Sequence, residues 1–152
     1  MILGIHYMDI ITPLFTVTAS AVGGRNGHSE TVDKAVSVDL SVPKEMGGPG
    51  KPDTVTPEHL FAAGYAACFA GALDFVAKQH KIDASHAKVS CSVSIGKRNP
   101  IGFALSVNLV IEDQKIPQEE LSALVNEAHE NICPYSHATR NNVKVTFDII
   151  GA

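Results

Sequence analysis

Three cysteines are the residues of this chain best suited to redox or nucleophilic chemistry, and they are Cys68, Cys91 and Cys133. A thiolate is a strong nucleophile, a thiol can be oxidised reversibly, and two thiols that meet can form a disulfide. No segment resembles a signal peptide, and an odd number of cysteines argues against a framework of structural disulfides. A pair formed among these cysteines is therefore expected to be catalytic rather than structural.

Each cysteine also has a structural interpretation. Cys68 lies in the middle of an apolar segment, where cysteine often serves as a small core residue. Cys91 alternates with serines on what reads as the apolar face of a strand, which predicts simple core packing. Cys133 directly precedes Pro134, at a point where a helix would be cut off. The residues alone leave open which of these thiols reacts.

Two other kinds of site would use the same residue types. His129 and Cys133 are four residues apart on a predicted helix, so both could face one metal ion. A zinc site needs about four ligands, and no CxxC or HxxxH pair completes one, so no metal is expected. A Cys–His pair for acyl transfer would also fit the residue types, but spacing singles out none of the seven histidines.

The elements that would position these residues follow from the apolar periodicity. In the N-terminal third, alternation predicts strands over residues 15–21 and 36–42, paired as a hairpin. Glycines at 23, 24 and 27 predict a turn around Arg25, which by itself would be a solvated turn residue. A loop rich in glycine and proline follows at residues 43–56, and a loop of that length is often functional.

The central segment predicts one long buried helix. Thr56, Pro57 and Glu58 form a helix start, with threonine as the N-cap and proline at the first helical position. The helix should run to about His80, and residues 60–73 are apolar or small on every side. At about 1.5 Å per residue its roughly 24 residues are about 36 Å long, longer than one small sheet can cover. A dimer that packs two such helices together would bury them.

The remaining elements complete an α+β fold. Alternation predicts strands at residues 89–95, 103–111 and 143–149, and Pro117 opens a helix that should stop near Cys133. The expected order is ββαββαβ, with antiparallel pairing wherever short turns join the strands.

Composition sets the class of protein. With 152 residues, 45% of them apolar, the chain is expected to be a single domain over residues 1–152. A net charge of −4 without a basic face argues against nucleic acid as a partner. The longest unbroken apolar run, residues 60–73, is too short to cross a bilayer, so we expect a cytoplasmic protein without a membrane partner.

Three segments resemble the organic hydroperoxide resistance group of the OsmC-like superfamily. The motifs are PEHLFAAGYAACF at residues 57–69, CPYSHATRNNV at residues 133–143 and the turn GGRNG at residues 23–27. The similarity runs from about residue 10 to residue 150, with residues 1–12 as an N-terminal extension. The departures are small, such as His137 where asparagine is common. The resemblance implies the OsmC-like fold, with antiparallel sheets packed around long central helices in an intertwined homodimer.

The same resemblance implies an activity and the residues that perform it. Cys68 would be the thiol that attacks organic hydroperoxides, and Cys133 would resolve it as a disulfide. Arg25 and Glu58 would activate Cys68. The implied reductant is a lipoylated protein or another dithiol, and no metal, haem or flavin is implied.

Elementary chemistry explains why such a site needs a cation. A free cysteine thiol has a pKa of ~8.5 and burial raises it, whereas only the thiolate attacks. Cys68 lies about three turns into the helix, too far for the helix N-terminus to help. Arg25 would supply the positive charge, and Glu58 would hold it in place. Apolar neighbours, namely Phe61, Tyr65 and Phe69, would favour a bulky alkyl chain over hydrogen peroxide.

Alternative functions remain open at this level. The protein could act on a different oxidant such as peroxynitrite, or it could be a thiol-based redox sensor or small-molecule binding module without turnover. Catalytic consumption of hydroperoxide at the expense of a dithiol distinguishes a peroxidase from a redox sensor or binding module without turnover.

Overall fold

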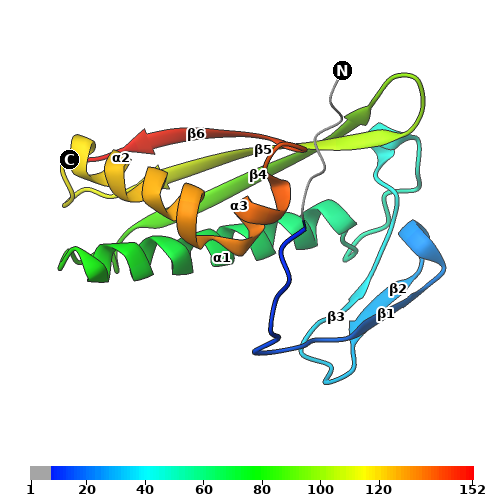
Figure 1. The fold of residues 1–152 in the computed structure, drawn as a ribbon. Coiled ribbons are helices and arrows are strands. Elements are labelled where there is room, and N and C mark those ends of the chain that lie inside the picture. Colours follow the sequence, from blue (N-terminus) through cyan, green and yellow to red (C-terminus); the bar gives the residue numbers. More distant parts are fainter. Residues whose placement is uncertain (1–7) are drawn as a thin grey trace, which may run out of the picture. The chain divides into compact units, whose positions relative to one another are not determined.

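The computed structural model describes residues 8–152, and the chain divides into two compact units (Figure 1). One unit ends at Val55 and the other comprises Thr56–Ala152. Part of the predicted N-terminal extension, residues 1–7, lies outside the described residues, and residues 8–12 form no helix or strand. The single domain expected over residues 1–152 stays a prediction.

The N-terminal unit is built on a small antiparallel sheet in the order β1-β2-β3. Its strands are β1 (Ala19–Val22), β2 (His28–Thr31) and β3 (Ser37–Asp39), followed by the 3₁₀ helix η2 (Lys44–Met46). The predicted hairpin between the first and last of these strands is wrong, because β2 lies between them and pairs with both. The sequence of β2 is His-Ser-Glu-Thr, which has no apolar alternation to reveal a strand.

The turn predicted around Arg25 is present as the short 3₁₀ helix η1 (Gly24–Asn26) between β1 and β2. Gly27 closes it, and a Cβ at this position would lie 1.8 Å from the carbonyl oxygen of Val22. Only glycine therefore fits there. The turn presents Arg25 partly buried on its own unit.

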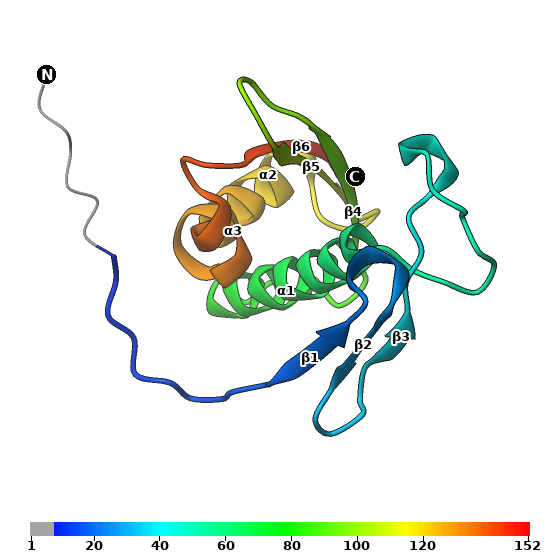
Figure 2. The same ribbon diagram turned by 90° about the vertical axis from the view of Figure 1, so that its right-hand side faces the viewer.

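The C-terminal unit contains a three-stranded sheet in the order β4-β5-β6 with its helices on one face (Figures 1 and 2). The elements are α1 (Pro57–Gln79), β4 (Lys88–Lys97), β5 (Phe103–Glu112), α2 (Gln118–Glu127), the π-helical turn η3 (Ala128–Ile132), α3 (Pro134–Thr139) and β6 (Lys144–Ile150). The predicted α+β class is confirmed.

Strand direction in this sheet departs from the expectation at one strand. β4 and β5 are antiparallel, as predicted, but β6 runs parallel to β5. The connection from β5 to β6 passes through α2, η3 and α3, and a crossover with helices returns the chain in the same direction. The prediction of antiparallel sheets is therefore wrong for β6.

The long helix begins where the sequence predicts. The hydroxyl oxygen of Thr56 accepts a hydrogen bond from the His59 backbone N–H at 3.3 Å, and His59 Nδ1 accepts one from the Thr56 backbone N–H at 3.0 Å. This reciprocal cap satisfies two backbone donors that would otherwise lack partners. The helix is unbroken from Pro57 to Gln79.

The core of this unit lies between α1 and the sheet. Side chains along α1, including Phe69, Leu73 and Val76, are almost fully buried against the helix-facing side of β5, where Leu109 and Ile111 are also buried. Each such side chain contributes about 1.5–3 kcal/mol by leaving water. By length and composition α1 would be able to cross a membrane, and one of its faces packs in the core of this unit.

Candidate active site

Two of the three cysteines meet in the C-terminal unit. The Sγ atoms of Cys68 and Cys133 are 3.7 Å apart, and both are free thiols. Cys68 is partly buried in the middle of α1, and Cys133 is 1% exposed. A disulfide bond is about 2.0 Å long, so an approach of about 1.7 Å would join them. The two sulfurs are thus close enough for a small movement to allow a disulfide.

A change of backbone conformation places Cys133 at this contact. Its backbone is extended, with φ −68° and ψ 116°, between the π-helical turn η3 and α3. Pro134 disfavours a helical residue before it and then serves as the first residue of α3. The Cys133 N–H donates to the carbonyl oxygen of Ala128 at 2.8 Å, which closes the π-helical turn. Arg140 Nη2 donates to the carbonyl oxygen of His129 at 2.6 Å and braces the same turn.

A buried polar network fixes α3 against α1. The hydroxyl of Tyr65 shares hydrogen bonds with Ser136 Oγ at 2.9 Å and with Thr139 Oγ1 at 3.3 Å. All three residues are almost fully buried. Because α3 carries Cys133 at its start, this network sets the distance between the two sulfurs.

Burial raises the pKa of the Cys68 thiol, and the nearby Cys133 thiol adds to the increase. A hydrogen bond from the Tyr135 backbone to the sulfur lowers the pKa but does not offset the burial. The residues of this unit therefore hold Cys68 as a thiol rather than a thiolate. This direction agrees with the expectation that a cation is needed to activate it.

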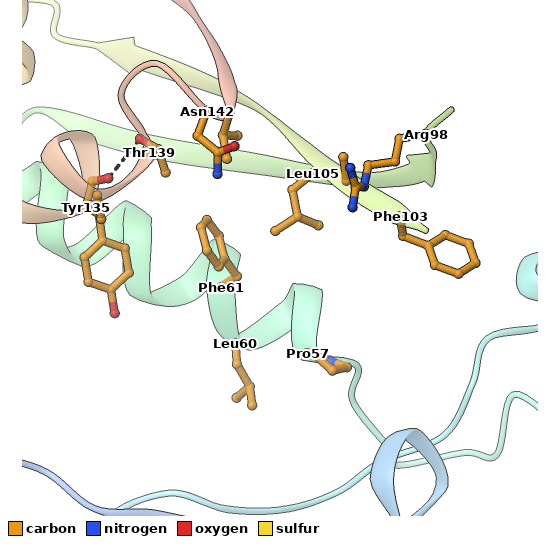
Figure 3. A pocket seen from close by; sticks show the side chains of 12 residues that line it. Pro57, Leu60, Phe61, Arg98, Phe103, Leu105, Tyr135, Thr139 and Asn142 are labelled. Carbon is orange, nitrogen blue, oxygen red and sulfur yellow. Dashed lines mark hydrogen bonds between the residues drawn. The ribbon is translucent and has the colours of Figure 1, made fainter. Parts of the chain in front are cut away.

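A cleft of about 950 Å³ opens between α1, the start of β5, α3 and the loop that follows it (Figure 3). Its walls are largely apolar, with Leu60, Phe61, Phe103, Leu105, Tyr135 and Val143 among the residues that line it. Tyr135 links the cleft to the thiol, because its ring lines the cleft and its backbone contacts the Cys68 sulfur.

The three predicted substrate-binding residues have different surroundings. Phe61 lines the cleft. Tyr65 lies behind it, and its ring is 5.7 Å from that of Tyr135. Phe69 is fully buried, with its ring 5.6 Å from that of Phe147. Phe61 is thus the one of the three that lines the cleft, whereas Tyr65 and Phe69 occupy core positions; substrate binding by these residues stays a prediction.

Of the remaining predicted residues, Glu58 lies in the first turn of α1 and Arg25 belongs to the N-terminal unit. Their roles in activating Cys68 stay predictions.

Cys91 is partly buried against the core on β4, and burial raises the pKa of its thiol. Within residues 8–152 no group of three or more His, Cys, Asp or Glu side chains is placed to hold a metal ion.

Sequence reasoning missed the residues of α3 that build the site, namely Tyr135, Ser136 and Thr139. The sequence analysis took Pro134 only as the end of a helix and predicted no helix after it. Proline is equally favoured at the first helical position, and that signal would have predicted a new helix.

Removal of the Tyr65 hydroxyl tests the network. We expect Tyr65→Phe to lower the free energy of unfolding by ~1–3 kcal/mol, because Ser136 loses its hydrogen-bond partner in a buried site. Formation of the Cys68–Cys133 disulfide should also slow. Denaturant unfolding of the reduced protein and the rate of thiol loss with oxidant measure both effects.

The matched control is Tyr65→Phe combined with Ser136→Ala, which removes both partners and should recover part of the lost stability. A double variant that is destabilised by the sum of the two single substitutions would show that the two hydroxyls do not act together.

Comparison with known proteins shows which protein family this chain is similar to. Residues 48–148 match the family model described as OsmC-like protein. The organic hydroperoxide resistance protein of Xanthomonas axonopodis pv. citri is 46% identical over 137 residues, which cover 90% of this chain and 94% of that protein. The organic hydroperoxide resistance protein OhrA of Bacillus subtilis is 40% identical over 138 residues, covering 90% and 96%.

The fold agrees with solved structures. The crystal structure of an organic hydroperoxide resistance protein from Legionella pneumophila superimposes with a TM-score of 0.86 at 44% identity, covering 91% of this chain and 99% of that one. OhrB of Bacillus subtilis gives 0.81 at 42% identity, covering 90% and 99%. By sequence and by fold, the chain belongs to the OsmC-like family and, within it, to the organic hydroperoxide resistance proteins.

Proposed function

We propose that this member of the organic hydroperoxide resistance proteins is a thiol peroxidase that reduces organic hydroperoxides at Cys68 and resolves the product with Cys133. The observation that carries the proposal is the 3.7 Å separation of two free thiols beside an apolar cleft.

The chemistry has three balanced steps. The Cys68 thiolate attacks one oxygen of the O–O bond, the other leaves as an alkoxide and takes a proton to become the alcohol, and Cys68 becomes a sulfenic acid. The Cys133 thiol then attacks the Cys68 sulfur, forming the disulfide and releasing water. A dithiol reduces this disulfide by exchange and is itself oxidised to a disulfide.

The proposed reaction uses a dithiol as co-substrate and needs no bound cofactor. The proposed reductant is a lipoyl-type dithiol, presented by a lipoylated protein in the cytoplasm, where the reducing environment regenerates it. The apolar walls of the cleft favour an alkyl or fatty acid hydroperoxide over hydrogen peroxide, because apolar surface gains by leaving water.

The deciding experiment measures peroxide consumption by the purified full-length protein with dihydrolipoamide as reductant. We expect catalytic turnover of tert-butyl and lipid hydroperoxides and much slower turnover of hydrogen peroxide. A single stoichiometric oxidation without turnover would favour a redox sensor instead.

Activation of Cys68 is assigned to Arg25. Since burial raises the pKa of the Cys68 thiol, a neighbouring guanidinium would lower it again and increase the thiolate fraction at neutral pH. Arg25→Ala should therefore slow alkylation of Cys68 roughly tenfold or more at pH 7, the effect of losing ~1.4 kcal/mol of thiolate stabilisation.

The alkylation profile of Arg25→Ala should also move to higher pH, because the thiolate forms only at higher pH once the cation is gone. Iodoacetamide labelling of the Cys91→Ser and Cys133→Ser background measures Cys68 alone. An unchanged profile would remove Arg25 from the mechanism.

The proposed assembly is a homodimer that packs the α1 helices together. A stripe of exposed apolar and small residues runs along α1 at helical spacing, comprising Leu60, Ala63, Ala67, Gly71 and Phe75. Leu60 is 37% exposed and Phe75 is 50% exposed. Small residues allow close approach of a second helix. Packing of the partner helix on this stripe would remove an apolar helix face from water.

The dimer would also bring Glu58 to the site. Ten residues of unbroken helix separate Glu58 from Cys68, about 15 Å along the axis and about 80° around it. In an antiparallel pair of α1 helices, Glu58 of the partner subunit would approach Cys68, with its Arg25 held beside it. Glu58 would then orient the guanidinium by a bidentate ion pair.

Subunit mixing tests this arrangement. Cys68→Ser and Glu58→Ala subunits are each expected to be inactive, and their heterodimer should regain activity because one of its two sites becomes wild type. Heterodimers isolated with two affinity tags are assayed for tert-butyl hydroperoxide reduction. No recovery would show that Glu58 and Cys68 act within one chain.

A further inference from the structure

Arg98 is the one charged residue among those that line the cleft. It directly follows β4, in the turn that connects β4 to β5. Its backbone N–H donates to the carbonyl oxygen of Gly102 and closes this turn. Its guanidinium extends along Gly102, and its Nε atom would be 3.3 Å from a Cβ at that position. Figure 3 shows the guanidinium turned toward Leu105, at the opposite end of the cleft from Tyr135.

No ion pair or side-chain hydrogen bond involves Arg98 within the described part of the chain. The other residues around the cleft are uncharged, so nothing in the lining neutralises its positive charge. A guanidinium at the end of an apolar channel is complementary to a molecule with an apolar chain and one anionic end, and its planar donor set suits a carboxylate in particular.

We infer that Arg98 binds the carboxylate of a long-chain fatty acid hydroperoxide and thereby orients the chain along the cleft toward Cys68. This inference rests on the proposed function and specifies its substrate. Arg98 would act as a specificity-determining residue, because it contacts the far end of the substrate and takes no part in the chemistry.

The register of the sheet gives the length that such a substrate needs. Phe69, next to Cys68, packs on Phe147, which pairs with Leu109 on β5. Leu109 is six residues beyond Phe103, where the cleft ends, and at ~3.3 Å per residue this span is about 20 Å. The Arg98 side chain covers part of it. An extended polypeptide spans ~3.3–3.6 Å per residue of three backbone bonds, or ~1.1–1.2 Å per bond; with a similar advance for a carbon chain, about ten or more bonds must separate the carboxylate from the peroxide.

The test compares linoleic acid hydroperoxide with its methyl ester, which differ only in the charged end. We expect the ratio of kcat/KM for the acid to that for the ester to fall about tenfold in Arg98→Gln, equivalent to about 1.4 kcal/mol. Arg98→Lys should retain part of the preference. Lys97→Gln is the matched control, because Lys97 is the neighbouring residue and does not line the cleft. It should leave the ratio unchanged.

Binding is measured independently of turnover. Calorimetric titration of the reduced full-length protein with linoleic acid should show weaker binding in Arg98→Gln, and methyl linoleate should show no such difference. An unchanged ratio in Arg98→Gln, or equal losses for acid and ester, would overturn the role of Arg98. If wild-type protein consumes no hydroperoxide, the proposed function fails and the titration alone decides whether Arg98 binds the carboxylate.

Discussion

Replacement of Cys68 by serine should reduce hydroperoxide consumption to the uncatalysed background, a loss on the order of a thousandfold or more. A serine hydroxyl is almost entirely protonated at neutral pH and cannot form a reversible sulfenic acid analogue. The substitution is nearly isosteric in a partly buried position, so the fold should persist. Initial rates with tert-butyl hydroperoxide and dihydrolipoamide measure the loss, and circular dichroism confirms the fold.

Cys91→Ser is the matched control, since Cys91 is the third thiol of the chain and packs on β4 against the core without contact to the other two sulfurs. This variant should keep most of the activity. It should lose some stability, because a hydroxyl is costlier to bury than a thiol. Comparable losses of activity in both variants would contradict the assignment of Cys68 as the attacking residue.

Local signals in the sequence were sufficient for part of this fold. Thr56 with Pro57 predicts the start of α1 because a cap and a fixed φ act within one turn, and the structure has that cap. β5 was predictable because Val107, Leu109 and Ile111 alternate into the core. β2 was not predictable by the same reasoning, because its four polar residues are held by pairing with two neighbours rather than by burial.

The candidate site, like the fold, could be predicted from the sequence only in part. The pairing of Cys68 with Cys133, which are 65 positions apart, came from the resemblance of two motifs, since nothing in their spacing brings them together. Their contact depends on α3, whose position is set by a hydrogen bond between Tyr65 and Ser136, which are 71 positions apart. Such long-range polar contacts produce no periodic pattern in the sequence from which they could be predicted. The parallel direction of β6 likewise follows from the whole crossover rather than from the strand.

Cys133→Ser should separate the attack on peroxide from the resolution of its product. The variant keeps Cys68 and the cleft, so it should consume its first equivalent of hydroperoxide at close to the wild-type rate and then fail to recycle. Without the neighbouring thiol, the Cys68 sulfenic acid cannot form the intramolecular disulfide and meets further hydroperoxide instead. It should then advance to sulfinic and sulfonic acids, which dithiols do not reduce. Steady-state turnover should fall at least tenfold.

Mass spectrometry of the variant after graded doses of cumene hydroperoxide decides this prediction. Wild-type protein should lose two hydrogens as the Cys68–Cys133 disulfide forms, whereas Cys133→Ser should gain oxygen atoms on the peptide that contains Cys68. Dimedone should trap the sulfenic acid in the variant and compete poorly in the wild type, because Cys133 is already 3.7 Å away. Steady turnover by Cys133→Ser with dihydrolipoamide would mean that the dithiol resolves Cys68 directly. The short distance between the sulfurs would then have to serve a purpose other than catalysis.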